Sequence, residues 1–415
     1  MRNAASVTFI MKLGIEVEYW VVDSDGRLTS ADAILDAHEY VVPEFVDSLV
    51  EIVLPPVATP AELEREFRDV LTAVLDAASA AGVRLVPLGT PLLEESPPIR
   101  SERGRILELI HGNRLRFAKN CAGTHVHFDQ GDPIAQANLL TALDPALALV
   151  STAPYYGGRR TSSSARAAAY RRGMGERFGR FRELRPYVRT RGERETRDRE
   201  RFEAFVRLAV EAGVDPALVA EQFRSENVRH GPVRIRDDLG TVEWRAPDTA
   251  LPSQVIRLAF DVARILEELS TKPLVVGDDV GVHPTAIVVP PFERLSELAD
   301  EAIDEGFTPR VGAYLTAFGF DVPAYSPLVE RFPRDAHLPE REARWLRLAF
   351  ADALERDVAE LGTRPAAAGR IGHPFGVGRL RYGVGRRPIR EWFASRGRTP
   401  RRRASHLTRA NVVPG

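Results

Sequence analysis

The chain of 415 residues has one cysteine, Cys121, and only three lysines among its 57 basic residues. A single cysteine excludes an internal disulfide, so a reducing cytoplasm is the expected compartment. No apolar run approaches the roughly 18 residues that span a bilayer, and no signal-peptide pattern precedes the first expected strand. These absences predict a cytoplasmic protein that works away from membranes, with Cys121 as a small buried filler rather than a nucleophile.

The formal net charge is −1, so no overall field draws the chain toward nucleic acid. Nearly all the positive charge is arginine, whose planar fork suits carboxylates and phosphates better than the ammonium of lysine. Basic residues accumulate among Gly, Ser and Pro only between Arg386 and Arg403, which predicts a flexible, solvated tail. The expected partners are small molecules, with neither nucleic acid nor membrane, and a homo-oligomer stays open.

Three separate segments alternate polar and apolar residues, and each begins at a glycine: Gly14–Tyr19, Gly123–Phe128 and Gly240–Arg245. Side chains two apart on a strand point to the same side of a sheet. Each segment therefore places one polar pair on one face; the pairs are Glu16 with Glu18, His125 with His127, and Glu243 with Arg245. One such pair alone is more often the solvated face of an antiparallel sheet. Three pairs together predict a single polar site that contains a cation, because charges facing a core are costly unless paired or bound to metal.

The expected ligands of that cation are mostly carboxylates. A further glutamate, Glu51, lies within the apolar run Ser48–Leu54. Oxygen donors with imidazole in the minority suit Mg²⁺ or Mn²⁺ better than zinc. Such a metal keeps positions open for phosphate oxygens, which arginines on the last hairpin, Arg234, Arg236 and Arg245, could also neutralise. No glycine-rich phosphate loop of the P-loop or dinucleotide-binding type is present.

Apolar periodicity and turn residues predict a mixed region of strands and helices up to residue 271, a mainly helical part from 272 to 385 and the basic tail from 386 to 415. Expected strands cover residues 12–22, 48–54, 83–88 and 122–128, and a hairpin covers 232–245. Expected helices cover residues 60–81, 101–119, 132–150, 199–212, 215–224, 253–269, 292–305 and 339–361. The arginine- and serine-rich segment 151–201 shows no buried pattern and is expected to be a mobile, substrate-facing insertion or a surface loop.

The three alternating segments, with Val50–Ile52 between the first two, resemble the signature strands of the glutamate–cysteine ligase type 2 family. The likeness extends through Ala246–Asp248 and through the loop from Ser151 to Arg166, and covers roughly residues 12 to 270. It implies an α+β fold, in which helices flank a curved antiparallel, glutamine-synthetase-like sheet whose concave face holds ATP, divalent cations and an amino acid. It also implies a two-step reaction, in which a carboxylate takes the γ-phosphoryl group of ATP and an amine then displaces phosphate to form an amide.

The resemblance also implies roles for residues. The metal ligands would be Glu16, Glu51, His125 and Glu243, with Glu18 on a neighbouring cation and in contact with the nucleotide. Arg245 would stabilise the transferred phosphoryl group, and Arg236 and Arg166 are further candidates for binding phosphate or the substrate carboxylate. His127 would lie behind the ligands or simply pack beside His125. The implied cofactors are ATP and Mg²⁺ or Mn²⁺, and the leading product is a γ-glutamyl amide.

Two other functions stay open. The first is a metal-dependent hydrolase or oxygenase built on His125 and His127. Such a site requires a glutamate a few residues after the second histidine, and the chain has only Asp129 and Asp132 there. The second is a non-catalytic nucleotide or metabolite sensor on the ligase fold. The amine acceptor is also open, because the Asn-Arg-Trp-like and Arg-Gly-Leu segments that usually follow the last signature strand in carboxylate–amine ligases are missing.

Overall fold

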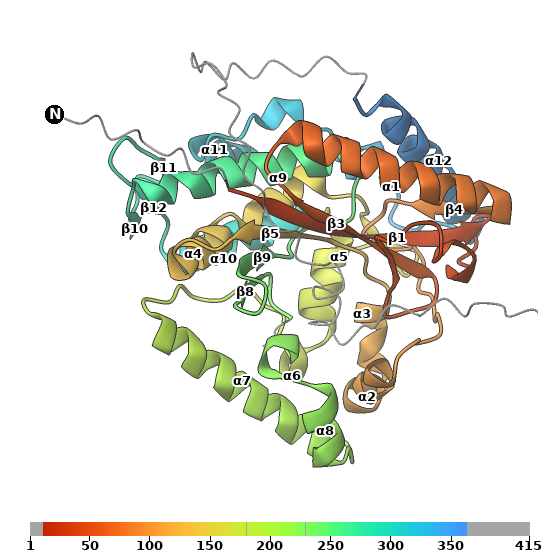
Figure 1. Cartoon of the computed structure of the whole chain (residues 1–415), viewed down its shortest axis with the longest axis horizontal. Coiled ribbons are helices and arrows are strands. Elements are labelled where there is room, and N and C mark those ends of the chain that lie inside the picture. Colours follow the sequence, from red (N-terminus) through yellow and green to blue (C-terminus); the bar gives the residue numbers. More distant parts are fainter. Residues whose placement is uncertain (1–10, 180, 229, 363–415) are drawn as a thin grey trace, which may run out of the picture.

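The computed structural model of the chain describes residues 11–179, 181–228 and 230–362 (Figure 1). The basic tail from 386 to 415 and the end of the helical part, from 363, lie outside the described residues. At the centre is a seven-stranded sheet in which every pairing is antiparallel. Its order is β2 (Val41–Pro43), β3 (Leu49–Val57), β1 (Leu13–Asp23), β5 (Thr124–Asp129), β9 (Thr241–Trp244) and β8 (Val233–Arg236), with β4 (Val83–Val86) also paired to β1. The predicted α+β class is confirmed.

The register of the sheet places the polar pairs side by side. Glu18 lies opposite Glu51, Glu16 opposite His125, and His127 opposite Glu243. Strand β3 continues through Pro55 and Pro56 to Val57, beyond the end that the prolines suggested. Proline is tolerated there because β2 pairs only with Val50–Ile52, which leaves this part of β3 at an edge where no ladder partner needs its N–H groups.

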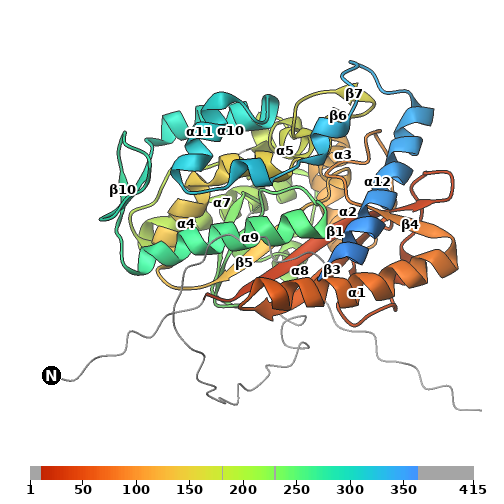
Figure 2. The same ribbon diagram turned by 90° about the horizontal axis from the view of Figure 1, so that it is seen from above.

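The apolar face of the sheet is covered by α1 (Pro60–Ala81), α9 (Pro252–Glu267) and α4 (Pro133–Ala142), with α12 (Glu340–Glu360) beside the first two (Figures 1 and 2). Helix α1 begins with the expected capping box, in which the Thr59 hydroxyl accepts a hydrogen bond from the Glu62 amide and the Glu62 carboxylate accepts one from the Thr59 amide. One main hydrophobic core forms on this face, and its members come from elements along the whole chain between Met11 and Leu361.

A second layer of helices lies across the other face of the sheet (Figure 1). Its elements are α2 (Glu102–His111), α3 (Arg116–Lys119), α5 (Ala165–Ala168), α6 (Glu176–Gly179), α7 (Arg191–Glu211) and α8 (Pro216–Gln222). Side chains of α2, α7 and α8 form a separate apolar cluster. The single helix expected over 101–119 is broken at Gly112, whose φ of 54° and ψ of −142° interrupt the helical hydrogen bonds before a 3₁₀ turn at Gly112–Leu115.

The expectation that residues 151–201 form a surface loop is wrong, and the alternative of a mobile, substrate-facing insertion stays a prediction. Residues 151–156 are buried and end in β6 (Tyr155–Tyr156), which pairs with β7 (Arg159–Arg160); a π-helix follows at Ala169–Gly173. This segment is held by polar contacts rather than by an apolar stripe. For example, Arg171 donates two hydrogen bonds of 2.7 Å to the buried carboxylate of Asp144. Hydrophobic periodicity could not reveal such an anchor.

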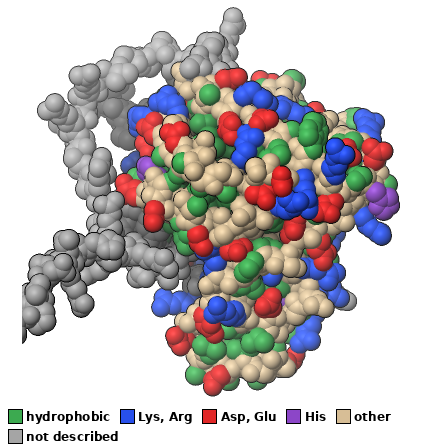
Figure 3. Space-filling view, turned by 90° about the vertical axis from the view of Figure 1, so that its right-hand side faces the viewer, with side chains coloured by type: hydrophobic (Ala, Val, Ile, Leu, Met, Phe, Trp, Pro, Cys, Tyr) green, Lys and Arg blue, Asp and Glu red, His purple; other side chains and the backbone are tan. Residues whose placement is uncertain are grey.

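After residue 272 the chain forms α10 (Phe292–Asp304), α11 (Pro309–Ala317) and α12, as a mainly helical part should. It also forms a small sheet of β10 (Leu274–Val276), β12 (Ile287–Val289) and β11 (Gly281–Val282), whose strands were too short to predict. The division at 272 stays a prediction. On the side of the molecule seen in Figure 3, acidic and basic side chains are intermixed.

No single helix of the described ranges is both long and apolar enough to cross a membrane. Only the bent pair of α4 and the 3₁₀ helix Asp144–Val150, whose axes differ by 55°, meets that test together.

Candidate active site

One face of the central sheet carries a row of charged and imidazole side chains, which we call the charged face. Its members are Glu51 on β3, Glu16 and Glu18 on β1, His125 and His127 on β5, Glu243 on β9, Arg234 and Arg236 on β8, and Arg245 just after β9. The residues that alternate with them, such as Val17, Val126 and Trp244, face the main core. The structure therefore brings the three sequence motifs together on one surface, although they are more than 100 residues apart in the chain.

Glu16 stands at the centre of the row and is only 2% exposed. Its Oε2 lies 3.1 Å from Nδ1 of His125 and its Oε1 lies 2.9 Å from Nε2 of His127. The other ring nitrogen of His127 lies 3.1 Å from the hydroxyl of Thr241, which fixes the orientation of that ring. One carboxylate on β1 thus contacts both histidines of the neighbouring strand.

Both histidines are neutral at ordinary pH. Burial, reinforced by the charge of Arg245, holds the pKa of His125 well below its usual value. Burial also lowers the pKa of His127 to about 4, although Glu243 acts in the opposite direction. The Nδ1 atom of His125 lies 3.2 Å from Nη1 of Arg245 as well as 3.1 Å from Glu16. One nitrogen of a neutral ring can donate to the carboxylate or accept from the guanidinium, but not both.

Glu243 is fully buried and is surrounded by arginines. Arg245 donates to its Oε1, while Arg236 and Arg234 lie 3.5 and 3.7 Å from its Oε2. Burial by itself would raise the pKa of Glu243, but Arg245 and Arg234 hold it well below the usual range, so this carboxylate stays ionised. Among the described residues, no donor makes a hydrogen bond to Oε2. A buried oxygen in that condition suits a metal ligand.

Three overlapping groups of side chains have donor atoms within 4.8 Å of one another, as a shared cation requires. They are Glu16 with Glu51 and His125, Glu16 with His127 and Glu243, and Glu18 with Glu44 and Glu51. The donors are mainly carboxylate oxygens, which fits Mg²⁺ or Mn²⁺. Burial, together with the charge of Glu44, raises the pKa of Glu18 to about 7. A divalent cation between these two carboxylates would relieve that repulsion.

The part of the chain that contains these strands matches a known protein family. The model of glutamate-cysteine ligase family 2 matches residues 12–295. The chain belongs to this family. A member from Salinispora arenicola, named among the type 2 glutamate–cysteine ligases, is 32% identical over 164 residues, which are 36% of this chain and 43% of the relative. The glutamate–cysteine ligase of Haloferax volcanii is 28% identical over 261 residues, which are 57% and 64% of the two chains. These matches span less than two thirds of either relative.

Two solved structures show a distant likeness. A bifunctional glutathione synthetase from Pasteurella multocida aligns with 84% of this chain and 53% of its own, at 15% identity and a TM-score of 0.49. A glutamate–cysteine ligase from Francisella tularensis in complex with AMP aligns with 85% and 82%, at 11% identity and a TM-score of 0.40.

The two further arginines that the family resemblance suggested are held in different ways. Arg236 forms two hydrogen bonds, of 3.0 and 2.8 Å, with Asp238 in the adjacent turn. Arg166 donates to the backbone carbonyls of Ala246 and Arg245, at 3.0 and 3.3 Å. Gly123 makes room for it, because a Cβ at that position would lie 2.1 Å from Nη2 of Arg166. In this arrangement Arg166 fixes the chain that carries Arg245.

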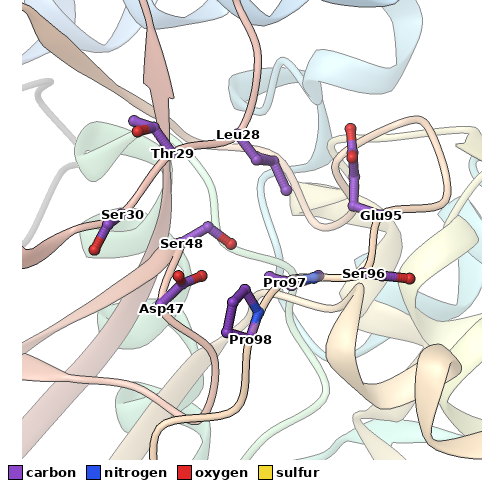
Figure 4. A pocket seen from close by; sticks show the side chains of 9 residues that line it. All are labelled: Leu28, Thr29, Ser30, Asp47, Ser48, Glu95, Ser96, Pro97 and Pro98. Atoms are coloured by element: carbon purple, nitrogen blue, oxygen red, sulfur yellow. The ribbon is translucent and has the colours of Figure 1, made fainter.

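Sequence reasoning missed a carboxylate and a pocket in this region. Glu44 follows the short strand β2 in a loop without any alternating pattern, so no signal distinguished it from a surface glutamate. A pocket of about 250 Å³ lies where the loop after β2 meets the segment before α2 (Figure 4). It is lined by Leu28, Thr29, Ser30, Asp47, Ser48, Glu95, Ser96, Pro97 and Pro98, none of which belongs to the charged face.

Proposed function

We propose that this chain is an ATP-dependent carboxylate–amine ligase that forms an amide through an acyl phosphate, with a γ-glutamyl amide as the leading product. Membership of the glutamate-cysteine ligase family supports the reaction class. The observation that carries the proposal is the buried row of Glu16, His125 and Glu243, which ends beside Arg245. Carboxylates for a cation and an adjacent guanidinium are what phosphoryl transfer requires, since its catalysis rests on positioning and charge neutralisation.

The carboxylates of the charged face would hold the metal. Glu16, Glu51, His125 and Glu243 would bind Mg²⁺ or Mn²⁺, and Glu18 with Glu44 would bind a neighbouring cation. When bound, the metal supplies positive charge to the phosphates of ATP. Contact with Glu16 and Thr241 would keep the His127 ring in place behind these ligands.

Arg245 would act on the transferred phosphoryl group. In the structure it contacts Glu243 and His125, two of the proposed metal ligands. These same ligands would hold the cation, which would supply positive charge beside the guanidinium. A substrate carboxylate would then attack the γ-phosphorus and ADP would leave; the amine would attack the acyl carbon and phosphate would leave. Arg236 and Arg166 would add positive charge from the sides.

The hydrolase or oxygenase alternative gains no support from the geometry. Such a site would use both histidines on one metal with a carboxylate shortly after them, but Asp129 accepts a hydrogen bond from the amide of Lys12 and joins neither histidine in a group of potential ligands among the described residues. A sensor with the same fold would also bind nucleotide, so only turnover separates it from a ligase.

The test is ADP release by the purified full chain with ATP, Mg²⁺ and glutamate, with and without cysteine or a mixture of other amines. We expect ADP release that depends on an amine and that falls at least a hundredfold in Glu243→Gln, because the variant keeps the shape but loses the charge. Glu203→Gln, an exposed glutamate on α7, is the matched control and should keep full activity. Nucleotide binding without turnover for any amine would indicate a sensor, and absence of nucleotide binding would refute the ligase.

A further inference from the structure

Arg182 is a buried cation that the family motifs do not include. It lies in the turn after α6 and is only 3% exposed. Its Nε and Nη1 atoms make no hydrogen bond to any residue within the described ranges. Burying a charged group with unmade hydrogen bonds costs several kcal/mol. Buried charges in proteins are therefore normally paired with a counter-ion.

Tyr170 forms the platform on which Arg182 rests. The guanidinium carbon of Arg182 lies 4.3 Å from the centre of the Tyr170 ring, and that of Arg166 lies 5.9 Å from it. Tyr170 belongs to the π-helix Ala169–Gly173. Single π-turns are frequently found at functional sites. Cation–π contact holds the Arg182 head in place without using any of its donors.

The surroundings of this pair carry an excess of positive charge. Burial by itself would raise the pKa of the Tyr170 hydroxyl, but the charges of Arg182, Arg245, Arg234 and Arg166 outweigh it and lower that pKa. Burial and repulsion from Arg245 lower the pKa of Arg234 to about 9. The charged face is therefore acidic at its β3–β1 end and basic at its β9–β8 end.

We propose that Arg182 and Tyr170 form an anion pocket at the basic end of the charged face, where they hold a carboxylate or phosphate group of a substrate. The proposal rests on the proposed function, because it deepens the account of the same site. An anion there would accept hydrogen bonds from the Arg182 nitrogens and from the Tyr170 hydroxyl, and it would balance Arg234 and Arg245. Two sources fit this chemistry, the phosphates of the nucleotide and the carboxylate of the amino acid.

The test measures binding rather than turnover. The melting temperature of the full chain is followed in EDTA with increasing tripolyphosphate in one arm and increasing glutarate in the other. We expect at least one anion to stabilise the protein and Arg182→Gln to weaken that anion at least tenfold. The anion that depends on Arg182 identifies the source. Arg189→Gln, an exposed arginine in the same segment, is the matched control and should bind like the original protein.

A second readout separates a binding role from a structural one. If Arg182 awaits an anion, Arg182→Gln should melt no lower than the original protein when no anion is present, since an unpaired buried charge has been removed. A lower melting temperature together with unchanged anion binding would overturn the proposal. Should Arg182→Gln fail to fold, Arg182→Lys and Tyr170→Phe take its place, and unchanged anion affinity in both would equally overturn it. Anion binding that needs Arg182 but no amine-dependent ADP release would refute the ligase and leave the pocket standing.

Discussion

The two faces of the central sheet are built from the same strands and serve opposite purposes. On one face Val17, Val126 and Trp244 pack into a continuous core; on the other Glu16, His125 and Glu243 form the charged face. Both sets are equally buried, at 4% exposure or less. Burial therefore does not distinguish stabilising residues from chemical ones in this protein. The two sets differ in the chemistry of their side chains, which are aliphatic or aromatic on one face and carboxylate or imidazole on the other.

The two faces also contribute differently to the free energy of folding. The apolar face contributes the favourable transfer of side chains from water, about 25 cal/mol for each Å² of apolar surface. The charged face has to be held together against the cost of burying ions. Substitutions on the two faces should therefore separate folding stability from activity.

The largest effect on stability is expected on the apolar face. Phe128 is fully buried between Leu13 and Val242 on the neighbouring strands. Phe128→Ala should lower the free energy of unfolding by about 3–5 kcal/mol through lost transfer energy and a residual cavity. Urea denaturation measures this, and Phe128→Leu, which keeps most of the volume, should lose much less. Activity per folded molecule should persist. A loss of activity as large as that of a charged-face variant would contradict the assignment of stability to one face and activity to the other.

Glu16→Gln tests the opposite face. We expect the rate of ADP release to fall at least about a hundredfold, or about 2.7 kcal/mol, because a central metal ligand loses its charge. The free energy of unfolding without metal should stay the same or rise, since a buried carboxylate has been neutralised. Steady-state assays and urea denaturation on the same samples measure both. Destabilisation comparable to that of Phe128→Ala would show that Glu16 holds the fold together.

A third effect, spread over several pH units, is expected in the helical layer over the charged face. His111 on α2 packs edge-on against Phe178, and burial, with the charge of Arg182, lowers its pKa from 6.5 to about 3. Between these pH values the unfolded chain binds a proton that the native chain does not. The free energy of unfolding should therefore rise with pH across this window, by up to about 1.4 kcal/mol per pH unit.

The prediction is checked by comparing the pH dependence of the free energy of unfolding in the original protein, in His111→Phe and in an exposed control. The variant should lose the contribution, while the exposed His337→Gln should keep it. Urea denaturation at several pH values measures the three slopes. Equal slopes in His111→Phe and the original protein would show that the imidazole titrates normally in the fold.

Much of the charged face could be predicted from sequence because it depends on strand periodicity. A period of two fixes that Glu16 and Glu18 share a side, and a similar pattern in three segments suggests one surface. Helix α1 could also be predicted from sequence, because its capping box and closing glycine are local signals. What periodicity cannot supply is the register between strands, which decided that Glu18 faces Glu51 and that His127 faces Glu243.

The missed residues lie where contacts are polar and non-local. Glu44 reaches the carboxylates from a loop, and Arg182 and Tyr170 reach the basic end from a segment that was expected to be mobile. Their positions depend on ion pairs and cation–π contacts with distant parts of the chain, such as the pairing of Arg171 with Asp144. The periodicity of residues along the sequence does not indicate which distant residues will be in contact.

Strand β1 carries Glu16 and Glu18 and is hydrogen-bonded to β3, β4 and β5. Its amides cannot reach deuterated solvent unless neighbouring strands separate, so they should exchange among the slowest in the protein. The proposed metal ligands on β1 would then sit on the part of the chain that opens least often. A cation would meet these carboxylates already in place, and motion during turnover would fall to the loops and helices around them.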